Sequence, residues 1–191
     1  MKKILTPLFL LFSILSFSQT VESLKLTTNK MYEALYNMAY DDVLDLTYPK
    51  VFDITNREQL HETLDASFEN RTLRKRYVMV HPTFTYSSIK KMDEKSIGIV
   101  NYTNVTRLFY EEKLTPLQVS EIKKTLTESG RYKTIRFESA RNCFYTESNI
   151  KMIAIADAST QNEWKFLNYE QVQYDVAKTV LGEASMKKLG L

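Results

Sequence analysis

Apolar side chains recur with the 3.6-residue period of an α-helix soon after the start of the chain. One side of a helix drawn over residues 21–39 carries Leu24, Met31, Leu35 and Met38. An apolar stripe on an otherwise polar helix is typical of a helix that packs against a core. We therefore predict a long amphipathic helix over residues 21–39.

Two shorter helices are predicted next. Two aspartates favour the first turn of a helix over residues 41–46, because carboxylates stabilise the positive end of the helix dipole. Pro49 ends this segment, since proline disfavours the helical conformation of the residue before it, and residues 51–53 are predicted to be extended. Asn56 is a typical N-cap of a third helix. The apolar face of that helix consists of Leu60, Leu64 and Phe68.

The period of the pattern changes to two from residue 77 onward, which predicts β-strands. The predicted strands cover residues 77–87, 96–110, 132–147, 150–157 and 163–169. Polar turns are predicted at residues 90–95, 148–149 and 158–162. Pro82 lacks a backbone N–H, so it indicates a bulge or an edge position in the first of these strands.

One helix interrupts the strands and another follows them. Residues 115–118 (TPLQ) form a typical helix start, with a capping threonine, proline at the first helical position and glutamine three residues after the cap. This helix is predicted over residues 116–129, and Gly130 ends it as a left-handed cap. A last helix is predicted over about residues 170–181 and ends at Gly182.

The order of these elements predicts an α+β fold, because helices and strands are largely segregated along the chain. The predicted architecture has N-terminal helices packed on a mostly antiparallel sheet, an additional helix between strands and a C-terminal helix. Residues 19–191 have the length of one domain. Cys143 is the only cysteine, which excludes an intramolecular disulfide, and its apolar surroundings predict a buried packing residue.

Residues 1–18 have the three parts of a secretory signal peptide. Two lysines are followed by an apolar stretch over residues 4–17, and Ser16 and Ser18 are small residues placed for cleavage before Gln19. The apolar stretch is shorter than the about 20 residues that span a bilayer, and no cysteine stands at the cut for lipid attachment. We predict an exported protein, periplasmic or secreted, without a stable membrane anchor. The alternative is an uncleaved anchor.

The charge of the chain does not favour a nucleic-acid partner. The full chain carries a net charge of +3, but removal of the two signal lysines leaves 24 basic against 23 acidic residues, a net charge of +1. The densest basic cluster consists of Arg71, Arg74, Lys75 and Arg76. We interpret it as a solvated helix end, where cations suit the helix dipole. Its alternative is a phosphate site.

Three stretches resemble the nuclear-transport-factor-2-like (SnoaL-like cone) superfamily. Residues 40–52 (YDDVLDLTYPKVF) and the helix start at 56–60 (NREQL) are similar to the beginning of such a domain. Residues 164–166 (WKF) are similar to its last strand. The resemblance implies helices laid across a strongly curved sheet, so that the domain forms a cone with an internal cavity. The helix over residues 116–129 and the C-terminal helix depart from this pattern, in positions to cover the mouth or an edge of the cone.

Residues suited to acid–base chemistry are few. His61 lacks the second histidine four residues later that a zinc-binding helix needs, so no metal site is predicted. His81 would act as a general base if Asp41, Asp53 or Glu138 lay beside it. The interpretation that we favour is a hydrogen-bonded histidine in the core or at a sheet edge.

A charged group lies on neighbouring predicted strands and consists of Arg107, Arg136, Glu138 and Arg141. Arg136 and Glu138 share a face, because strand side chains repeat every two residues. The group would form an anion clamp inside the cone or, as we favour, cross-strand ion pairs on the solvated face. Tyr102, like other tyrosines of the predicted strands, suits a half-buried position or the wall of a ligand site.

These features predict a non-catalytic binding module for a small apolar or amphipathic ligand or a protein partner, without a metal or organic cofactor. The candidate ligand-binding residues are His81, Tyr102, Arg136 and Glu138. One alternative is a cofactor-free enzyme of the isomerase, dehydratase or hydrolase type, with His81 and a carboxylate as the base. The other is an interaction protein that forms a homodimer through the sheet face.

Overall fold

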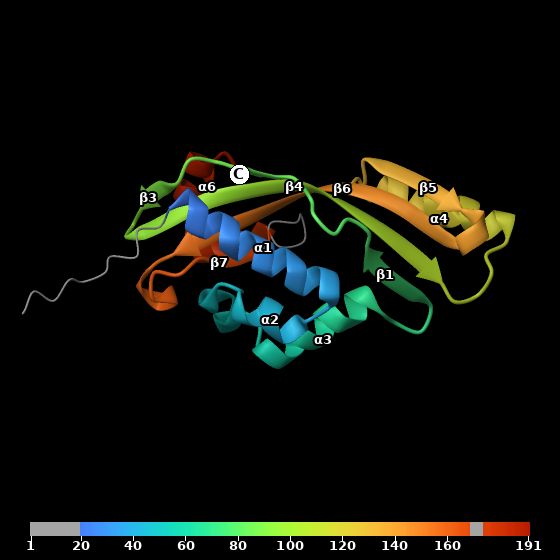
Figure 1. The fold of residues 1–191 in the computed structure, drawn as a ribbon, viewed down its shortest axis with the longest axis horizontal. Helices are drawn as coiled ribbons and strands as arrows, with labels where there is room; N and C mark the ends of the chain where they lie inside the picture. The colour runs from blue at the N-terminus through green and yellow to red at the C-terminus, as the bar shows by residue number, and fades with distance from the viewer. Residues whose placement is uncertain (1–19, 169–173) are drawn as a thin grey trace, which may run out of the picture.

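The computed structural model describes residues 20–168 and 174–191. These residues form six α-helices and a seven-stranded antiparallel sheet that is not closed, which confirms the α+β class. Figure 1 shows that two long strands, β4 (Lys95–Tyr110) and β6 (Cys143–Ala156), run along most of the molecule. The predicted signal peptide, and the start of the predicted last helix, lie outside the described residues.

The remaining elements are short. The N-terminal helices are α1 (Val21–Asn37), α2 (Tyr40–Asp45), the 3₁₀ helix η1 (Pro49–Asp53) and α3 (Arg57–Phe68). The short strands are β1 (Leu73–Tyr77), β2 (Phe84–Tyr86), β3 (Lys90–Met92), β5 (Thr134–Glu138) and β7 (Lys165–Asn168). The later helical segments are α4 (Pro116–Glu128), η2 (Ser139–Arg141), η3 (Ala158–Thr160), α5 (Tyr174–Leu181) and α6 (Glu183–Leu189).

Side-chain caps fix two helix starts where the sequence predicts them. Asn56 Oδ1 accepts a hydrogen bond of 2.6 Å from the backbone N–H of Gln59 at the start of α3. Thr115 and Gln118 form a reciprocal capping box at the start of α4. Gly130 follows the end of α4 with a φ of +65°, the left-handed conformation that glycine adopts without a steric penalty.

The pairing of β4 with β6 organises the sheet. It extends without interruption from Ser96 opposite Ala156 to Phe109 opposite Cys143. β3, β2 and β1 pair with successive parts of the free side of β4, while β7 and β5 pair with the two ends of the free side of β6. Because the register has no break, all even-numbered residues of β4 and β6 share one face of the sheet, which we call the even face. The opposite face is called the odd face.

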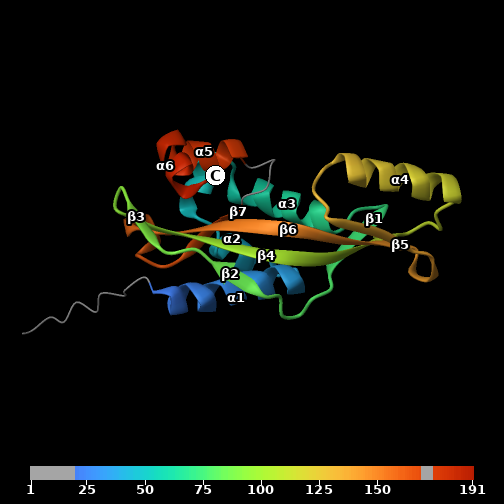
Figure 2. The same ribbon diagram turned by 90° about the horizontal axis from the view of Figure 1, so that it is seen from above.

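Helices cover both faces at the end of the sheet that holds β3 and β7. On the even face, Val100 and Met152 belong to one core cluster with Leu24 and Leu35 of α1. On the odd face, the second core cluster combines strand isoleucines with residues of α5, α6 and the segment before η1; its fully buried members include Ile97, Ile153, Tyr48, Ala177 and Met186. Figure 2 shows α1 on one side of β4 and β6, with α5 and α6 on the other. This end of the molecule is therefore a three-layer structure.

Gly98 allows α1 to lie close to the sheet. A Cβ atom at this position would lie 3.0 Å from Cδ2 of Leu24, which is fully buried. That distance is shorter than an ordinary carbon–carbon contact of about 3.5–4.0 Å. The absence of a side chain at Gly98 thus sets the distance between helix and sheet.

At the other end of the sheet, β1 and β5 flank the two long strands, and α4 lies beside β5 (Figures 1 and 2). The even face here buries Leu108 and Phe144. The odd face carries Arg107 and Tyr145 on facing positions of β4 and β6. The two faces of this end therefore differ in polarity.

The prediction of a single strand over residues 77–87 is wrong. The structure has two strands, β1 and β2, which pair with separate parts of β4. Pro82 lies between them and cannot donate to a sheet ladder, so the chain leaves the sheet at this point. β1 also begins earlier than predicted, so Arg74, Lys75 and Arg76 lie in a strand and not at a helix end.

The predicted turn at residues 148–149 is also wrong, because β6 continues through it. Ser148 and Asn149 lie opposite Asn104 and Thr103 in the β4 ladder. The true turn is at residues 139–142, where Asn142 has a φ of +49°. Asparagine tolerates this left-handed conformation better than most residues, which makes Asn142 the turn residue.

Two helical segments differ from the predictions. Residues 51–53, predicted to be extended, belong to η1, in which Pro49 takes the first position with a φ suited to a helix. Gly182 does end a helix, α5, but the chain then continues into α6 (Glu183–Leu189). Cys143 is fully buried, as predicted. Within the described ranges, no helix has both the length and the apolar character needed to cross a membrane.

Candidate functional site

An apolar cavity of about 120 Å³ lies between the N-terminal helices and the sheet, at the edge formed by β7. Its described wall residues come from α1, α2, η1, α3, α5, β6 and β7 and from the segments that follow α2 and η1: Met31, Leu35, Val43, Thr47, Val51, Thr55, Leu60, Leu64, Met152, Phe166, Leu167 and Val176. None of these side chains is titratable. The wall therefore presents hydrophobic surface and no acid–base group.

Helical spacing and one backbone contact assemble this wall. Met31 and Leu35 are four residues apart on α1, as are Leu60 and Leu64 on α3, so each pair points from one side of its helix. The segment after α2 is held against β7, where the N–H of Phe166 donates to the carbonyl of Leu46 at 2.8 Å. The cavity thus lies where the N-terminal helices and α5 meet one sheet edge.

The two threonines of the wall have hydrogen-bond partners inside the protein. The hydroxyl of Thr47 donates to the carbonyl of Val43 at 2.8 Å. The hydroxyl of Thr55 donates to Oε1 of Gln59 at 3.3 Å. An apolar molecule in the cavity would consequently leave neither hydroxyl without a partner.

A second cavity, of about 250 Å³, lies further along the even face. Its described wall is mostly polar and consists of Lys75, Tyr77, Asn104, Thr106, Gly130, Arg131, Tyr132, Ser148, Asn149 and Ile150. We call it the polar cavity. Asn104 is 3% exposed, and its Oδ1 atom has no hydrogen-bond partner within the described part of the chain.

An aromatic cluster separates the two cavities. The ring of Tyr32 on α1 lies 5.7 Å from that of Tyr77, 5.5 Å from that of Tyr102 and 5.8 Å from that of Phe84. The Tyr32 hydroxyl donates to the carbonyl of Met79 at 2.6 Å, and burial raises the pKa of Tyr32 to about 12. Tyr32 is consequently neutral at physiological pH.

Of the residues predicted for a ligand site, Tyr102 lies in this aromatic cluster on the even face. It is 5% exposed and packs between Tyr32 and Phe84. On the same face it follows Val100, beside Met152 of the apolar cavity, and precedes Asn104 of the polar cavity. Tyr102 is thus part of the boundary between the two cavities.

Arg136 and Glu138 lie together on the opposite face of the sheet. Glu138 pairs with three arginines, at 2.9 Å from Arg107 Nε, 3.1 Å from Arg136 Nη2 and 3.7 Å from Arg141 Nη1. The hydrogen bond from Arg107, followed by that from Arg136, lowers the pKa of Glu138 to about 2. The Arg136 guanidinium also stacks 4.5 Å from the ring of Tyr145. The arrangement is a cross-strand ion-pair network on the odd face, and it shares no face with Tyr102.

His81 lies in the segment between β1 and β2 and is exposed. The predicted carboxylate partners are engaged elsewhere or distant in the fold. Asp41 lies beside Arg57 on the helices, and Glu138 is bound by arginines. No hydrogen bond or ion pair joins His81 to Asp41, Asp53 or Glu138 in the described ranges. The structure therefore does not bring His81 together with a carboxylate.

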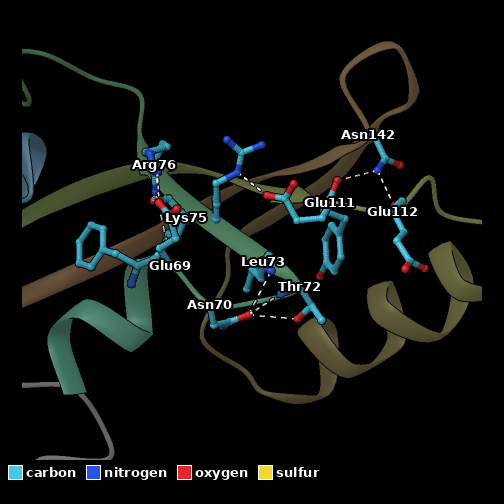
Figure 3. Close-up of polar contacts among 12 residues, drawn as sticks. Glu69, Asn70, Thr72, Leu73, Lys75, Arg76, Glu111, Glu112 and Asn142 are labelled. Atoms are coloured by element: carbon cyan, nitrogen blue, oxygen red, sulfur yellow. Dashed lines mark hydrogen bonds and ion pairs between the residues drawn. The ribbon is translucent and has the colours of Figure 1, made fainter. Parts of the chain in front are cut away.

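The basic cluster predicted at the helix-to-strand junction forms ion pairs at the edge of β1 (Figure 3). Arg76 pairs with Glu69, and Arg74 Nε lies 2.6 Å from Glu111. Lys75 points to the other face of β1, with its ammonium 4.3 Å from the ring centre of Phe68. The two paired arginines thus lack the free charge that a phosphate site on this edge would use.

Asparagine side chains shape the loops around this edge, as Figure 3 also shows. Asn70 Oδ1 accepts hydrogen bonds of 3.0 Å from the backbone N–H groups of Thr72 and Leu73, which turns the chain from α3 into β1. Asn142 Nδ2 donates to the carbonyls of Tyr110 and Glu112 at 2.9 and 2.8 Å. These bonds tie the end of β4 to the start of β6.

Asn104 is not among the ligand-site residues predicted from the sequence, although one signal for it exists. In the predicted strand over residues 96–110, the alternation places Asn104 on the same face as Val100, Tyr102 and Leu108. A polar amide in an apolar row of this kind indicates either an internal hydrogen bond or a ligand. The structure provides no internal partner for its Oδ1 within the described residues.

No protein-family model matches this sequence, and no curated protein matches it either.

Proposed function

We propose that the protein is a non-catalytic binding module that holds a small apolar molecule, or the apolar end of an amphipathic one, between its N-terminal helices and the sheet. The observation that carries this proposal is the apolar cavity, whose described wall has no titratable side chain. General acid–base catalysis needs such a group within hydrogen-bond reach of the substrate. Binding needs only the hydrophobic surface that the wall provides.

The size of the cavity limits the ligand. An apolar cavity of about 150 Å³ in another protein stays dry and binds benzene, and the volume here is about 120 Å³. A single small ring or a short alkyl chain fits this volume. A larger amphipathic ligand would place only its apolar end inside.

The proposal includes the cone architecture implied by the resemblance to the nuclear-transport-factor-2-like superfamily. In its support, the three N-terminal helices lie beside the long antiparallel sheet and contact it as far as β1 (Figure 1). The apolar cavity lies between these helices and the sheet. The two C-terminal helices, α5 and α6, pack on the odd face of the sheet. They therefore do not compete with the N-terminal helices for the even face. A structure of the protein with its ligand bound tests whether the sheet curves around the ligand.

Export is the second part of the proposal and rests on the signal-like residues 1–18. Expression of the full chain with its own N-terminus, followed by N-terminal sequencing of the protein outside the cytoplasm, tests it. We expect the first residue to be Gln19. A protein that keeps Met1 and stays with the membrane fraction would support the uncleaved anchor instead.

Binding is tested with toluene as the probe, followed by two-dimensional ¹H–¹⁵N NMR. We expect saturable shifts for residues around the apolar cavity. Val176→Phe, which places a ring at the cavity wall, should abolish the shifts. Val180 is one turn further along α5 and is not among the described wall residues, so Val180→Phe is the matched control and should retain them. Absence of any saturable shift in the unmodified protein would refute the proposal.

A further inference from the structure

Two polar side chains lie opposite each other on the even face without hydrogen-bond partners. Asn104 of β4 is directly paired with Ser148 of β6 in the ladder, and residues opposite each other in this way have Cβ atoms about 4.5–5.5 Å apart. Oδ1 of Asn104 is buried without a partner in the described residues. The half-buried hydroxyl of Ser148 likewise forms no hydrogen bond to a described residue. The ladder thus brings two unsatisfied polar groups together.

The next pair on the same face is satisfied. The hydroxyls of Thr106 and Thr146 lie 2.6 Å apart, so that one donates to the other. The side chains of Asn104 and Ser148 form no such bond across the same ladder in the described part of the chain. A buried polar group without a partner is destabilising and rare in native structures. The contrast between the two pairs indicates that another molecule provides the missing hydrogen bonds.

Both side chains belong to the wall of the polar cavity. Its volume of about 250 Å³ is somewhat below the range of about 300–1,000 Å³ that is typical of sites for drug-sized ligands. Tyr77 and Tyr132 contribute aromatic surface to the same wall. Sites for small molecules commonly combine such surface with a few polar groups that orient the ligand. The cavity therefore fits one small molecule.

The chemistry of the two unsatisfied groups selects the ligand. An amide both donates and accepts hydrogen bonds, and so does a hydroxyl. Both groups are neutral, so hydrogen bonds match them without a charge on the ligand. None of the described wall residues is a carboxylate, so a ligand ammonium group would find no counter-ion in this wall. A neutral molecule with adjacent hydroxyl groups meets these conditions.

We infer that the polar cavity binds a small neutral polyol of the size of a monosaccharide. One ligand hydroxyl donates to the amide of Asn104, and a neighbouring hydroxyl pairs with that of Ser148. The rings of Tyr77 and Tyr132 provide apolar surface for the C–H groups of the ligand. This site shares no described wall residue with the apolar cavity and does not depend on the proposed function.

The ligand class is tested by isothermal titration calorimetry of the purified protein. The neutral probes are D-glucose, D-galactose, D-mannose and myo-inositol, and the charged counterparts are D-glucosamine and D-glucuronate. We expect at least one neutral polyol to bind at millimolar concentration or below, and neither charged sugar to bind more tightly. Failure of all four neutral polyols would leave a bound water as the partner of Asn104 and would overturn the inference. A charged sugar that binds about tenfold more tightly than every neutral polyol would also overturn it.

Two variants locate the binding. Asn104→Leu keeps the branched shape but removes both hydrogen-bonding atoms, so it should weaken binding of the preferred polyol about tenfold or more without lowering the melting temperature. Ser148→Ala removes one half-buried hydroxyl and should weaken binding about threefold or more. Ser67→Ala is the matched control, because its hydroxyl donates to the carbonyl of Leu64 within α3, and it should bind like the unmodified protein.

The two variants also keep the test independent of folding. Ser148→Ala deletes a single oxygen atom and leaves the buried Asn104 in place, so its result stands even where Asn104→Leu fails to fold. Unchanged affinity in Ser148→Ala, together with unchanged affinity in a folded Asn104→Leu or with loss of folding in that variant, would show that the polyol binds elsewhere and would refute the site.

Discussion

The hydroxyl of Tyr48 donates a hydrogen bond of 2.6 Å to Oδ2 of Asp157, which joins the start of η1 to the end of β6 across 109 residues of sequence. Both side chains are buried. Burial alone would raise the pKa of Asp157, but the hydrogen bonds from Ser159 and Tyr48 outweigh it and leave the pKa below its usual value. Burial, reinforced by this bond, raises the pKa of Tyr48. The pair is thus a neutral donor and an ionised acceptor across the physiological pH range.

Removal of the Tyr48 hydroxyl should destabilise the protein. In Tyr48→Phe the buried carboxylate of Asp157 loses one donor, and hydrogen bonds to charged groups contribute about 1.5–3 kcal/mol. We expect a decrease of that size in the free energy of unfolding, measured by urea denaturation at pH 7. Tyr145→Phe removes a hydroxyl that donates to the half-buried Glu147 and should cost less. An equal cost for both variants would contradict the special role of Asp157.

The ion pairs of Glu138 should make stability depend on pH in the acidic range. Its pKa of about 2 in the folded protein lies below the value of about 4.3 for an unfolded chain. The contribution is therefore complete above about pH 4.3 and is lost as the pH falls toward 2. Glu138→Gln should lower the free energy of unfolding at pH 7 by about 1 kcal/mol and should flatten its decrease between pH 4.5 and 2. Guanidinium denaturation at several pH values measures the free energy of unfolding at pH 7 and its decrease in acid.

The matched control for this pH dependence is Glu69→Gln. Glu69 pairs with Arg76, but its side chain is 51% exposed, so its ion pair is screened by solvent. We expect its acid-range profile to follow the unmodified protein. A Glu138→Gln profile that also follows the unmodified protein would show that the network does not contribute to stability.

A methyl group at position 98 should strain the contact between α1 and the sheet. In Gly98→Ala the new Cβ meets Cδ2 of Leu24, which is fully buried and has little room to move. Overpacking of a core typically costs about 1–3 kcal/mol, and we expect a value near the lower end because one side-chain methyl group is affected. In a Leu24→Ala background the same substitution should cost nothing or stabilise the protein. Thermal unfolding of the unmodified protein, the two single variants and the double variant separates the strain at position 98 from the cost of truncating Leu24.

A ligand in the apolar cavity should stabilise the fold by mass action. At a toluene concentration 100 times its Kd, the free energy of unfolding should rise by about 2.7 kcal/mol. For a chain of this size the corresponding increase in melting temperature is roughly 5–10 °C. Val176→Phe should reduce the increase to zero, and differential scanning calorimetry gives the comparison. An equal increase in Val176→Phe would place the toluene outside this cavity.

Local signals in the sequence predict the starts of α3 and α4 well, because their N-caps are short-range interactions. Asn56 and the pair Thr115 and Gln118 act on backbone groups within three residues. The turn at residues 139–142 was missed for the opposite reason. It depends on Asn142, whose amide bonds the carbonyls of Tyr110 and Glu112 about 30 residues away. The chain around Ser148 looks like a turn locally, but pairing with β4 keeps it extended.

The candidate site was predictable only in part. Alternation along a strand places Tyr102 and Asn104 on one face, whereas Arg136 and Glu138 come from a different strand, whose register with β4 no local pattern fixes. Pairing of β5 with β6 puts those two residues on the odd face, away from the cavities. His81 has the alternating neighbours of a strand, but a proline directly after it takes the chain out of the ladder. The two cavities arise from contacts between distant segments, and the separate segments carry no sign of them.

The contacts of α1 with the end of the chain also bear on the order of folding. Nε1 of Trp164 donates to the hydroxyl of Ser23 at 3.0 Å, and Phe166 pairs with the segment after α2. The first helices to leave the ribosome therefore obtain the last of their core partners only when β7 has been synthesised. Contacts of such long sequence separation slow folding, so the core around α1 is complete only late in translation. A chaperone that shields amphipathic helices would find its substrate in the nascent form of this protein.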